Sequence, residues 1–264
     1  MIAALAPLYV GEFSSYRHVL TTRDDAGPSI PASQLLQTAR LDAIFQRFDP
    51  LHTGQDRRAL ASQWSKYYLV RLIPPVVAAA LLLGWRLPLA FEDVEVVLDE
   101  QGLPQAFKLP HEGGPFGTPP SDPFQRFGEL IDANLQPFIQ GLASEVRLSP
   151  KVLWSSAGNY LEWFLGEMTK ALPAVVLTHG HELLASERRP DGRRNPLFRP
   201  VRYVEVSPAL RPDGLWRQRR VCCIRYRLEH FEHCDNCPLL DQPPAYVSDL
   251  SSPRHRPAGQ GAVW

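Results

Sequence analysis

Four cysteines near the carboxyl end are the residues of this sequence best suited to chemistry. They are the only cysteines in a chain of 264 residues, and they follow the spacing C-C-x10-C-x2-C as Cys222, Cys223, Cys234 and Cys237. Cysteines that only fill a core are scattered through a fold, whereas these all lie in one short segment. The spacing therefore predicts a site in which four thiolates bind a soft metal centre.

Thiolates bind both zinc and iron-sulfur clusters, and the spacing bears on which of the two is present. Structural zinc sites usually offer two C-x2-C loops, but only Cys234 and Cys237 have that form here. Residues 216–225 have the pattern of a strand, in which the neighbours Cys222 and Cys223 leave on opposite faces. A two-iron centre spreads its ligands more widely, so we favour a [2Fe-2S] cluster with a local bend at this pair. Zinc and metal-free redox thiols remain as alternatives.

The cysteine segment resembles the C-terminal signature of the FhuF-type ferric-siderophore reductases, a family that binds one [2Fe-2S] cluster. The resemblance is carried by residues 219–228, RRVCCIRYRL, and residues 234–237, CDNC. It extends more weakly over residues 60–240 and includes the segment LWSSAG at 153–158, where Ser156 replaces the Asn of the family pattern. Further similar residues are Tyr67, Tyr68, Pro74, Pro75, Trp163, Leu165, Glu167, Met168, Asn195, Pro196 and Leu197.

The resemblance implies an oxidoreductase that passes one electron from the cluster to Fe(III) in a ferric siderophore of the hydroxamate type and releases Fe(II). It implies that the four cysteines are both the cluster ligands and the catalytic residues. Two readings from other classes stay open, namely a zinc-stabilised interaction domain and an iron-sulfur sensor. The sequence shows no helix-turn-helix signature that would favour the sensor.

The source of electrons is expected to be another protein. Residues 113–117, GGPFG, do not match a dinucleotide-binding or phosphate-binding loop, so the sequence offers no flavin or nicotinamide site. We therefore expect an external donor such as a ferredoxin or a flavodoxin. Such donors are acidic, and residues 188–227 contain twelve Arg, no Lys and three acidic residues, a net charge of +9.

Within this basic stretch, Arg219, Arg220, Arg225 and Arg227 lie next to the cysteines and are candidates for docking the donor or the substrate. Peripheral contact with the inner membrane would use the same charge. The alternative is that most of the twelve are ordinary solvated positions, because Arg outnumbers Lys throughout the chain. No nucleic-acid-binding motif is present, and the rest of the chain is acidic, so we expect no nucleic-acid partner.

Composition is that of a folded monomer in a reducing compartment. The chain is 44% hydrophobic and has a formal net charge of zero. A chain of this length and hydrophobic content can bury one core without disulfides. Residues 1–10 lack the basic start of a secretory signal, so we expect a cytoplasmic protein in which the thiols stay reduced. The longest apolar stretch, residues 72–85, is too short to span a bilayer and predicts a buried helix.

The fold class predicted from these patterns is α+β, mainly helical with two β-hairpins and a C-terminal cysteine loop. Helices are predicted over residues 32–48, 57–83, 124–146 and 151–172, the second with a kink or restart at its two prolines. Hairpins are predicted over 91–109 and 201–224, and the second ends at the cysteine pair. We expect one domain over 1–240, with a cluster-binding segment at 215–240, and a disordered tail over 241–264.

Other candidate residues have simpler explanations. His179 and His181 form an H-x-H pair without a third ligand in register, which is more typical of surface histidines. His230 and His233 flank the cysteine loop, where they would hydrogen-bond cluster sulfurs or have no role. The remaining candidates are three aromatic residues at helical spacing, which are core positions by default: Trp154, Tyr160 and Trp163.

Overall fold

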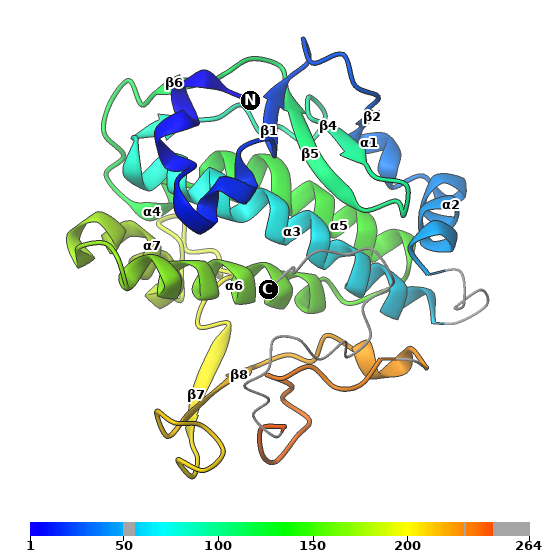
Figure 1. The fold of residues 1–264 in the computed structure, drawn as a ribbon, viewed down its shortest axis with the longest axis vertical. Helices are drawn as coiled ribbons and strands as arrows, with labels where there is room; N and C mark the ends of the chain where they lie inside the picture. Colours follow the sequence, from blue (N-terminus) through cyan, green and yellow to red (C-terminus); the bar gives the residue numbers. More distant parts are fainter. Residues whose placement is uncertain (50–55, 230, 245–264) are drawn as a thin grey trace.

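The computed structural model describes residues 1–49, 56–229 and 231–244 and has the predicted α+β architecture. A small sheet and the amino-terminal segment cover one side of the long helices, while a projecting hairpin and the cysteine segment lie on the other (Figure 1). Between them, helix α3 (Arg57–Leu82) packs against helix α6 (Pro150–Thr169). The cysteine segment is therefore built on the helices and not on the sheet.

The amino-terminal half provides the sheet, whose strand order is β1-β5-β4-β2. Strand β1 runs parallel to β5, and the other neighbours are antiparallel. The hairpin predicted over 91–109 is confirmed by β4 and β5. Besides α3, the elements of this half are η1 (Ala3–Leu8), η2 (Gly11–Tyr16), β1 (Leu20–Thr22), β2 (Ile30–Pro31), α1 (Ala32–Leu35), α2 (Thr38–Phe48), β3 (Trp85–Arg86), β4 (Glu95–Leu98), β5 (Pro104–Leu109) and β6 (Gly114–Pro115).

Helix α3 is continuous through Pro74 and Pro75, so the helix does not restart there, which was one of the two predicted alternatives. Pro74 has no N–H to offer the carbonyl of Val70 one turn earlier. The Tyr16 hydroxyl donates a hydrogen bond to that carbonyl at 3.2 Å instead. By length and hydropathy α3 could cross a membrane, but 72% of its most apolar window is buried, as in the core helix of a folded domain.

Two other predicted helices are interrupted. The helix predicted over 32–48 is divided into α1 and α2 because Gln37 is extended, which lets both Leu35 and Leu41 point into the core. The helix predicted over 124–146 is three pieces. They are α4 (Pro123–Arg126), the π-helix η4 (Glu129–Leu135) and α5 (Gln136–Glu145).

The π-helix η4 places Asn134 at the centre of the core. Its side-chain oxygen accepts a hydrogen bond from the Tyr68 hydroxyl at 2.9 Å, and its amide donates to the Leu89 carbonyl at 2.9 Å. All of these polar atoms are buried and would be costly to leave unpaired. The interruption of the helix is therefore explained by a buried polar network that periodicity alone does not reveal.

The carboxyl-terminal half follows the predicted order with shorter elements. Helix α6 begins at Pro150 and ends at Thr169, and the Ser149 side chain makes no capping hydrogen bond. The second predicted hairpin is confirmed by two antiparallel strands. Its second strand ends at Arg219, before the cysteine pair. The remaining elements of this half are η5 (Ala174–Leu177), α7 (Thr178–Ala185), β7 (Val201–Glu205), β8 (Leu215–Arg219) and η6 (Arg225–Arg227).

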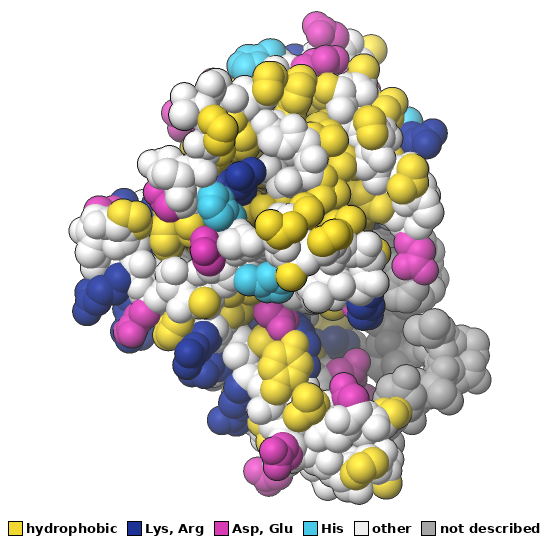
Figure 2. Space-filling model, turned by 90° about the vertical axis from the view of Figure 1, so that its left-hand side faces the viewer, with side chains coloured by type: hydrophobic (Ala, Val, Ile, Leu, Met, Phe, Trp, Pro, Cys, Tyr) yellow, Lys and Arg dark blue, Asp and Glu magenta, His cyan; other side chains and the backbone are white. Residues whose placement is uncertain are grey.

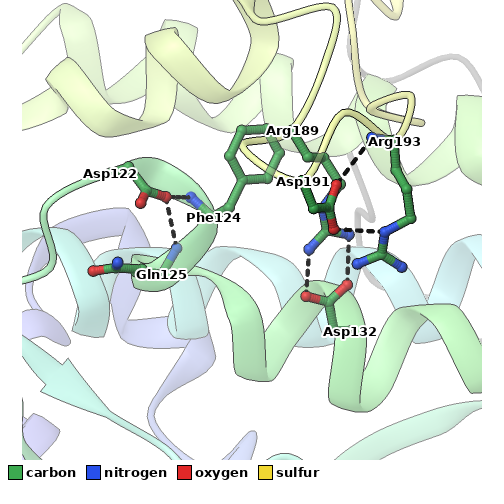
Figure 3. Close-up of polar contacts among 7 residues, drawn as sticks. All are labelled: Asp122, Phe124, Gln125, Asp132, Arg189, Asp191 and Arg193. Carbon is green, nitrogen blue, oxygen red and sulfur yellow. Dashed lines mark hydrogen bonds and ion pairs between the residues drawn. The ribbon is translucent and has the colours of Figure 1, made fainter.

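The loop before β7 is fixed to η4 by one buried arginine. The side chain of Arg189 is 9% exposed, forms a bidentate ion pair with Asp132 of η4 and lies over the ring of Phe124 (Figure 3). In the same loop, Asp191 accepts hydrogen bonds from the backbone and the side chain of Arg193. These contacts use Arg189 and Arg193 structurally and leave neither as a free surface cation.

Candidate metal centre

Strand β8 holds the C-x2-C loop beside the cysteine pair. The Trp216 indole N–H donates to the Asp235 carbonyl at 2.8 Å, and the Gln218 amide donates to the Cys237 carbonyl at 3.1 Å. The backbone N–H of Arg219 donates to the Asn236 carbonyl at 2.9 Å. The loop therefore lies alongside β8, close to the cysteine pair that follows this strand.

The pair of adjacent cysteines sits at a backbone bend. Ile224 has a left-handed conformation with φ of 52°, and its N–H donates to the Cys222 sulfur at 3.2 Å. A non-glycine residue in this region is uncommon and reverses the course of the chain. The strand predicted to reach residue 224 ends at Arg219, so residues 220–223 do not continue it. The local bend predicted at the cysteine pair is present.

The four thiols lie close together. The Cys223 and Cys234 sulfurs are 3.8 Å apart, and Cys222 lies near both Cys223 and Cys237. None is in a disulfide. A tetrahedral metal with sulfur ligands at about 2.3 Å has sulfur–sulfur edges of about 3.8 Å, so Cys223 and Cys234 are spaced as ligands of one metal.

The arrangement fits a two-iron centre better than a single ion. In the described part of the chain, no three His, Cys, Asp or Glu side chains are placed to hold one metal ion. A [2Fe-2S] cluster takes four thiolates over two irons, so each iron needs only two of them. The four cysteines thus fit this cofactor, as predicted.

Two cations border the thiols. The Lys66 ammonium of α3 lies 3.3 Å from the Cys223 sulfur. The Arg219 side chain is 2% exposed and donates to the Ser156 hydroxyl at 2.9 Å. Its Nε and that of Arg225 are buried without a hydrogen-bond partner. Buried donors are nearly always paired, so these two point toward a group bound between the protein atoms.

These surroundings favour ionised sulfur at Cys223. The hydrogen bond from Cys234, and then the charges of Lys66 and Arg219, hold the pKa of Cys223 far below its usual value although burial opposes this. The same pairing raises the pKa of Cys234, and burial raises that of Cys222. The surroundings therefore stabilise negative charge on the Cys223 sulfur, the form in which cysteine binds metals.

Helices α3 and α6 anchor the cysteine segment through buried polar groups. On α3, the Ser62 hydroxyl donates to the Cys223 carbonyl at 2.8 Å. On α6, the Ser155 hydroxyl donates to the Val221 carbonyl at 3.3 Å, and Asn159 accepts from the Asn236 amide at 2.8 Å. These residues were not singled out from the sequence as site residues. They are far from the cysteines along the chain, and serine and asparagine give no pattern that marks them.

The four candidate docking arginines have different environments. Arg219 is buried and cannot contact a partner at the surface. Arg225 is half-buried over the ring of Phe231, and Arg227 pairs with Asp56 at 2.8 Å. Arg220 is exposed, and among the described residues it forms no ion pair. Arg220 is therefore the strongest remaining candidate for docking.

The candidate histidines do not add ligands to the site in the described part of the chain. His179 accepts a hydrogen bond from the Arg126 side chain at 2.9 Å. His233 is exposed and stacks on the Tyr226 ring with centroids 5.4 Å apart. His230 lies outside the described residues. The three aromatic candidates Trp154, Tyr160 and Trp163 pack against the hydrophobic core, as the default reading predicted.

Asp56 links the start of α3 to the cysteine segment and makes stability sensitive to acid. Hydrogen bonds from Arg58, and then from Arg227, hold its pKa well below the usual range. A depressed carboxyl pKa adds stability above the unfolded value of about 3.9 and loses it as the pH falls. We expect Asp56→Asn, which keeps a helix-capping oxygen, to lower the free energy of unfolding by about 1 kcal/mol at pH 7.

Urea unfolding at pH 7 and at pH 3 measures this effect. The difference between Asp56→Asn and the unchanged protein should be smaller at pH 3 than at pH 7, because the carboxylate contribution begins to be lost below the unfolded pKa of about 3.9 and disappears only as the pH falls through the depressed pKa of the folded protein. Asp42→Asn, which removes an exposed partner of Arg57, is the matched control. An equal loss of stability at both pH values would contradict the assignment.

Comparison with known proteins supports the resemblance inferred from the sequence. Residues 62–209 match the family described as "Ferric iron reductase FhuF-like transporter", and residues 219–239 match the "FhuF 2Fe-2S C-terminal domain". The second match contains all four cysteines. A protein of Escherichia coli (strain K12) called ferric siderophore reductase is 32% identical over 186 residues, which cover 70% of this chain and 67% of the relative.

Proposed function

The chain belongs to the FhuF family of ferric iron reductases and carries the family's 2Fe-2S domain, and from this premise we propose that it reduces siderophore-bound Fe(III). One electron leaves a protein donor and reduces one Fe(III) to Fe(II), which is released in the cytoplasm. The observation that carries the proposal is the convergence of four thiols within residues 219–239.

The four cysteines would hold the [2Fe-2S] cluster, which supplies one-electron transfer when bound. The fold determines which of the four cysteines face solvent. Cys223 and Cys237 are 1% exposed, whereas Cys222 and Cys234 are half-buried, so one side of the site is open toward solvent. An electron can pass between that side and a docked partner over a short distance, while the buried side is fixed by α3 and α6.

The substrate chemistry explains why no acid or base is needed at the site. Siderophores bind Fe(III) through hard oxygen ligands, and Fe(II) is held much less tightly by such ligands. Reduction alone therefore loosens the iron. The hydroxamate class is proposed from the family resemblance, and the relative in Escherichia coli carries the name of a ferric siderophore reductase.

The electron donor is proposed to be an acidic protein such as a reduced ferredoxin or flavodoxin. Four of the twelve arginines of residues 188–227 form ion pairs with Asp132, Glu162, Glu187 or Asp56. On the face drawn in Figure 2, Lys and Arg side chains are interspersed with Asp and Glu. Donor binding is therefore expected to depend on a small exposed set next to the cysteines, with Arg220 its clearest member.

Charge reversal at Arg220 tests this docking surface. Arg220→Glu is expected to lower kcat/KM for an acidic donor roughly threefold to tenfold at low ionic strength, because like charges slow the encounter. Reduction by dithionite, which needs no docked protein, should be unchanged. Arg17→Glu, an exposed change in the amino-terminal segment, is the control. Equal rates for both variants with the protein donor would exclude Arg220 from the docking surface.

The location of the reaction is proposed to be the cytoplasm, with the protein acting as a monomer. The four free thiols suit a reducing compartment. The exposed arginine beside the site would also permit peripheral contact with the anionic inner face of the membrane. Co-sedimentation with anionic vesicles at low and high salt measures that contact.

A turnover assay under nitrogen tests the proposed function. The purified protein is supplied with a reductant and a ferric hydroxamate siderophore, and Fe(II) is captured by a chromogenic chelator. We expect a brown protein that produces Fe(II) catalytically. A colourless protein with one bound zinc would favour the structural domain. A coloured protein that leaves the siderophore oxidised would favour the sensor.

A further inference from the structure

Lys66 occupies an unusual position in the middle of α3. It is one of only four lysines in the chain, and it lies in a helix that is otherwise mostly buried. Its ammonium donates to the Gln63 side-chain oxygen at 2.8 Å and to the Cys223 sulfur at 3.3 Å. The second contact joins residues that are 157 positions apart, so the tertiary fold places this charge against the cysteine.

No acidic side chain balances this charge. Among residues 1–49, 56–229 and 231–244, neither Lys66 nor Arg219 forms an ion pair with Asp or Glu. A partly buried lysine head is costly unless it is paired and hydrogen-bonded. The Cys223 sulfur, as a thiolate, is the group in contact with Lys66 that can compensate its charge.

We propose that Lys66 sets the reduction potential of the cluster through its contact with the Cys223 sulfur. The inference rests on the proposed function, because it assumes that the cluster is bound by these cysteines. Reduction adds one electron, and hence one negative charge, to the centre. The ammonium attracts that added charge, and its hydrogen bond withdraws electron density from the sulfur, so both effects favour the reduced state.

Lys66 is better placed for this role than the other nearby cation. Arg219 directs one guanidinium nitrogen to the hydroxyls of Ser155 and Ser156, at 3.4 and 2.9 Å, so part of its charge is engaged on α6. Only Lys66 has a resolved hydrogen bond from a charged side chain to a cysteine sulfur in the described part of the chain. Its loss should therefore have the larger effect on the potential.

The test is a redox titration of the bound cluster, followed by its paramagnetic signal and without siderophore or protein donor. Lys66→Met keeps an unbranched side chain of nearly the same length and removes the charge. At a fixed ambient potential, it is expected to lower the ratio of reduced to oxidised cluster about tenfold, which corresponds to about 59 mV for one electron. Lys66→Arg keeps the charge and should shift the ratio by much less. Lys151→Met, an exposed change on α6, is the control for charge alone.

The outcomes separate this inference from the proposed function. A Lys66→Met cluster with the potential of the unchanged protein would overturn the role of Lys66 while leaving the cluster in place. Absence of any titratable signal in the unchanged protein would overturn the proposed function itself. If Lys66→Met does not load with iron, Lys66→Gln takes its place. Equal shifts for Lys66→Met and Lys151→Met would also contradict a specific contact.

Discussion

Replacing Cys223 by serine is expected to abolish cluster binding and ferric reduction together. Cys223 is 1% exposed, and its sulfur lies 3.8 Å from that of Cys234, within reach of Lys66. Serine offers a hard oxygen that is protonated at neutral pH, whereas the centre needs a soft thiolate. Loss of an outer partner of a metal ligand typically costs 10- to 100-fold in metal affinity or activity, and loss of the ligand itself should cost more.

Iron and sulfide content, visible absorption and Fe(II) production measure this prediction in one preparation. Asp235→Asn is the matched control, because it changes an exposed side chain inside the same loop. The control should keep its colour and activity. A Cys223→Ser protein that stays coloured and active would remove Cys223 from the ligand set.

Removal of the cluster is expected to open the cysteine segment while the helical core stays folded. The segment is anchored by polar contacts such as Ser62 to the Cys223 carbonyl and Gln218 to the Cys237 carbonyl. Most of the hydrophobic core lies instead in residues 2–197. A metal centre that binds the folded segment and not the open one contributes its binding free energy to the folding of that segment.

Hydrogen exchange with and without the cluster measures the change. Amides of residues 220–240 should exchange about 100-fold faster in the cluster-free protein, equivalent to about 2.8 kcal/mol, while amides in the middle of α3 change by less than about threefold. Unfolding of the whole chain at once would contradict this division. It would also show that the segment and the core form one cooperative unit, in keeping with the single domain predicted over residues 1–240.

The parts of this protein that were predictable from sequence are those with a local signal. The cysteine spacing marks the candidate centre, and alternating residues with turn signals mark the two hairpins now seen as β4–β5 and β7–β8. Helices α3 and α6 have strong apolar patterns. The bounds of α3 were predicted to within one residue, whereas α6 ends at Thr169, three residues before its predicted end.

Features that depend on distant partners were missed. Strand β1 has only three residues, and it is a strand because it pairs with β5, which follows it by more than eighty residues. The π-helix η4 exists where Asn134 meets Tyr68 and Leu89. Lys66 gave one signal that could have been used, namely a lysine within a helix whose other residues are mostly apolar or small.

The most direct test of the account is a single-turnover reaction. The protein is reduced, freed of excess reductant under nitrogen and mixed with one equivalent of a ferric hydroxamate siderophore. We predict that the paramagnetic signal of the reduced cluster disappears as Fe(II) forms, with one Fe(II) for each electron stored. A reduced signal that persists in the presence of the siderophore, with no Fe(II) produced, would contradict the account.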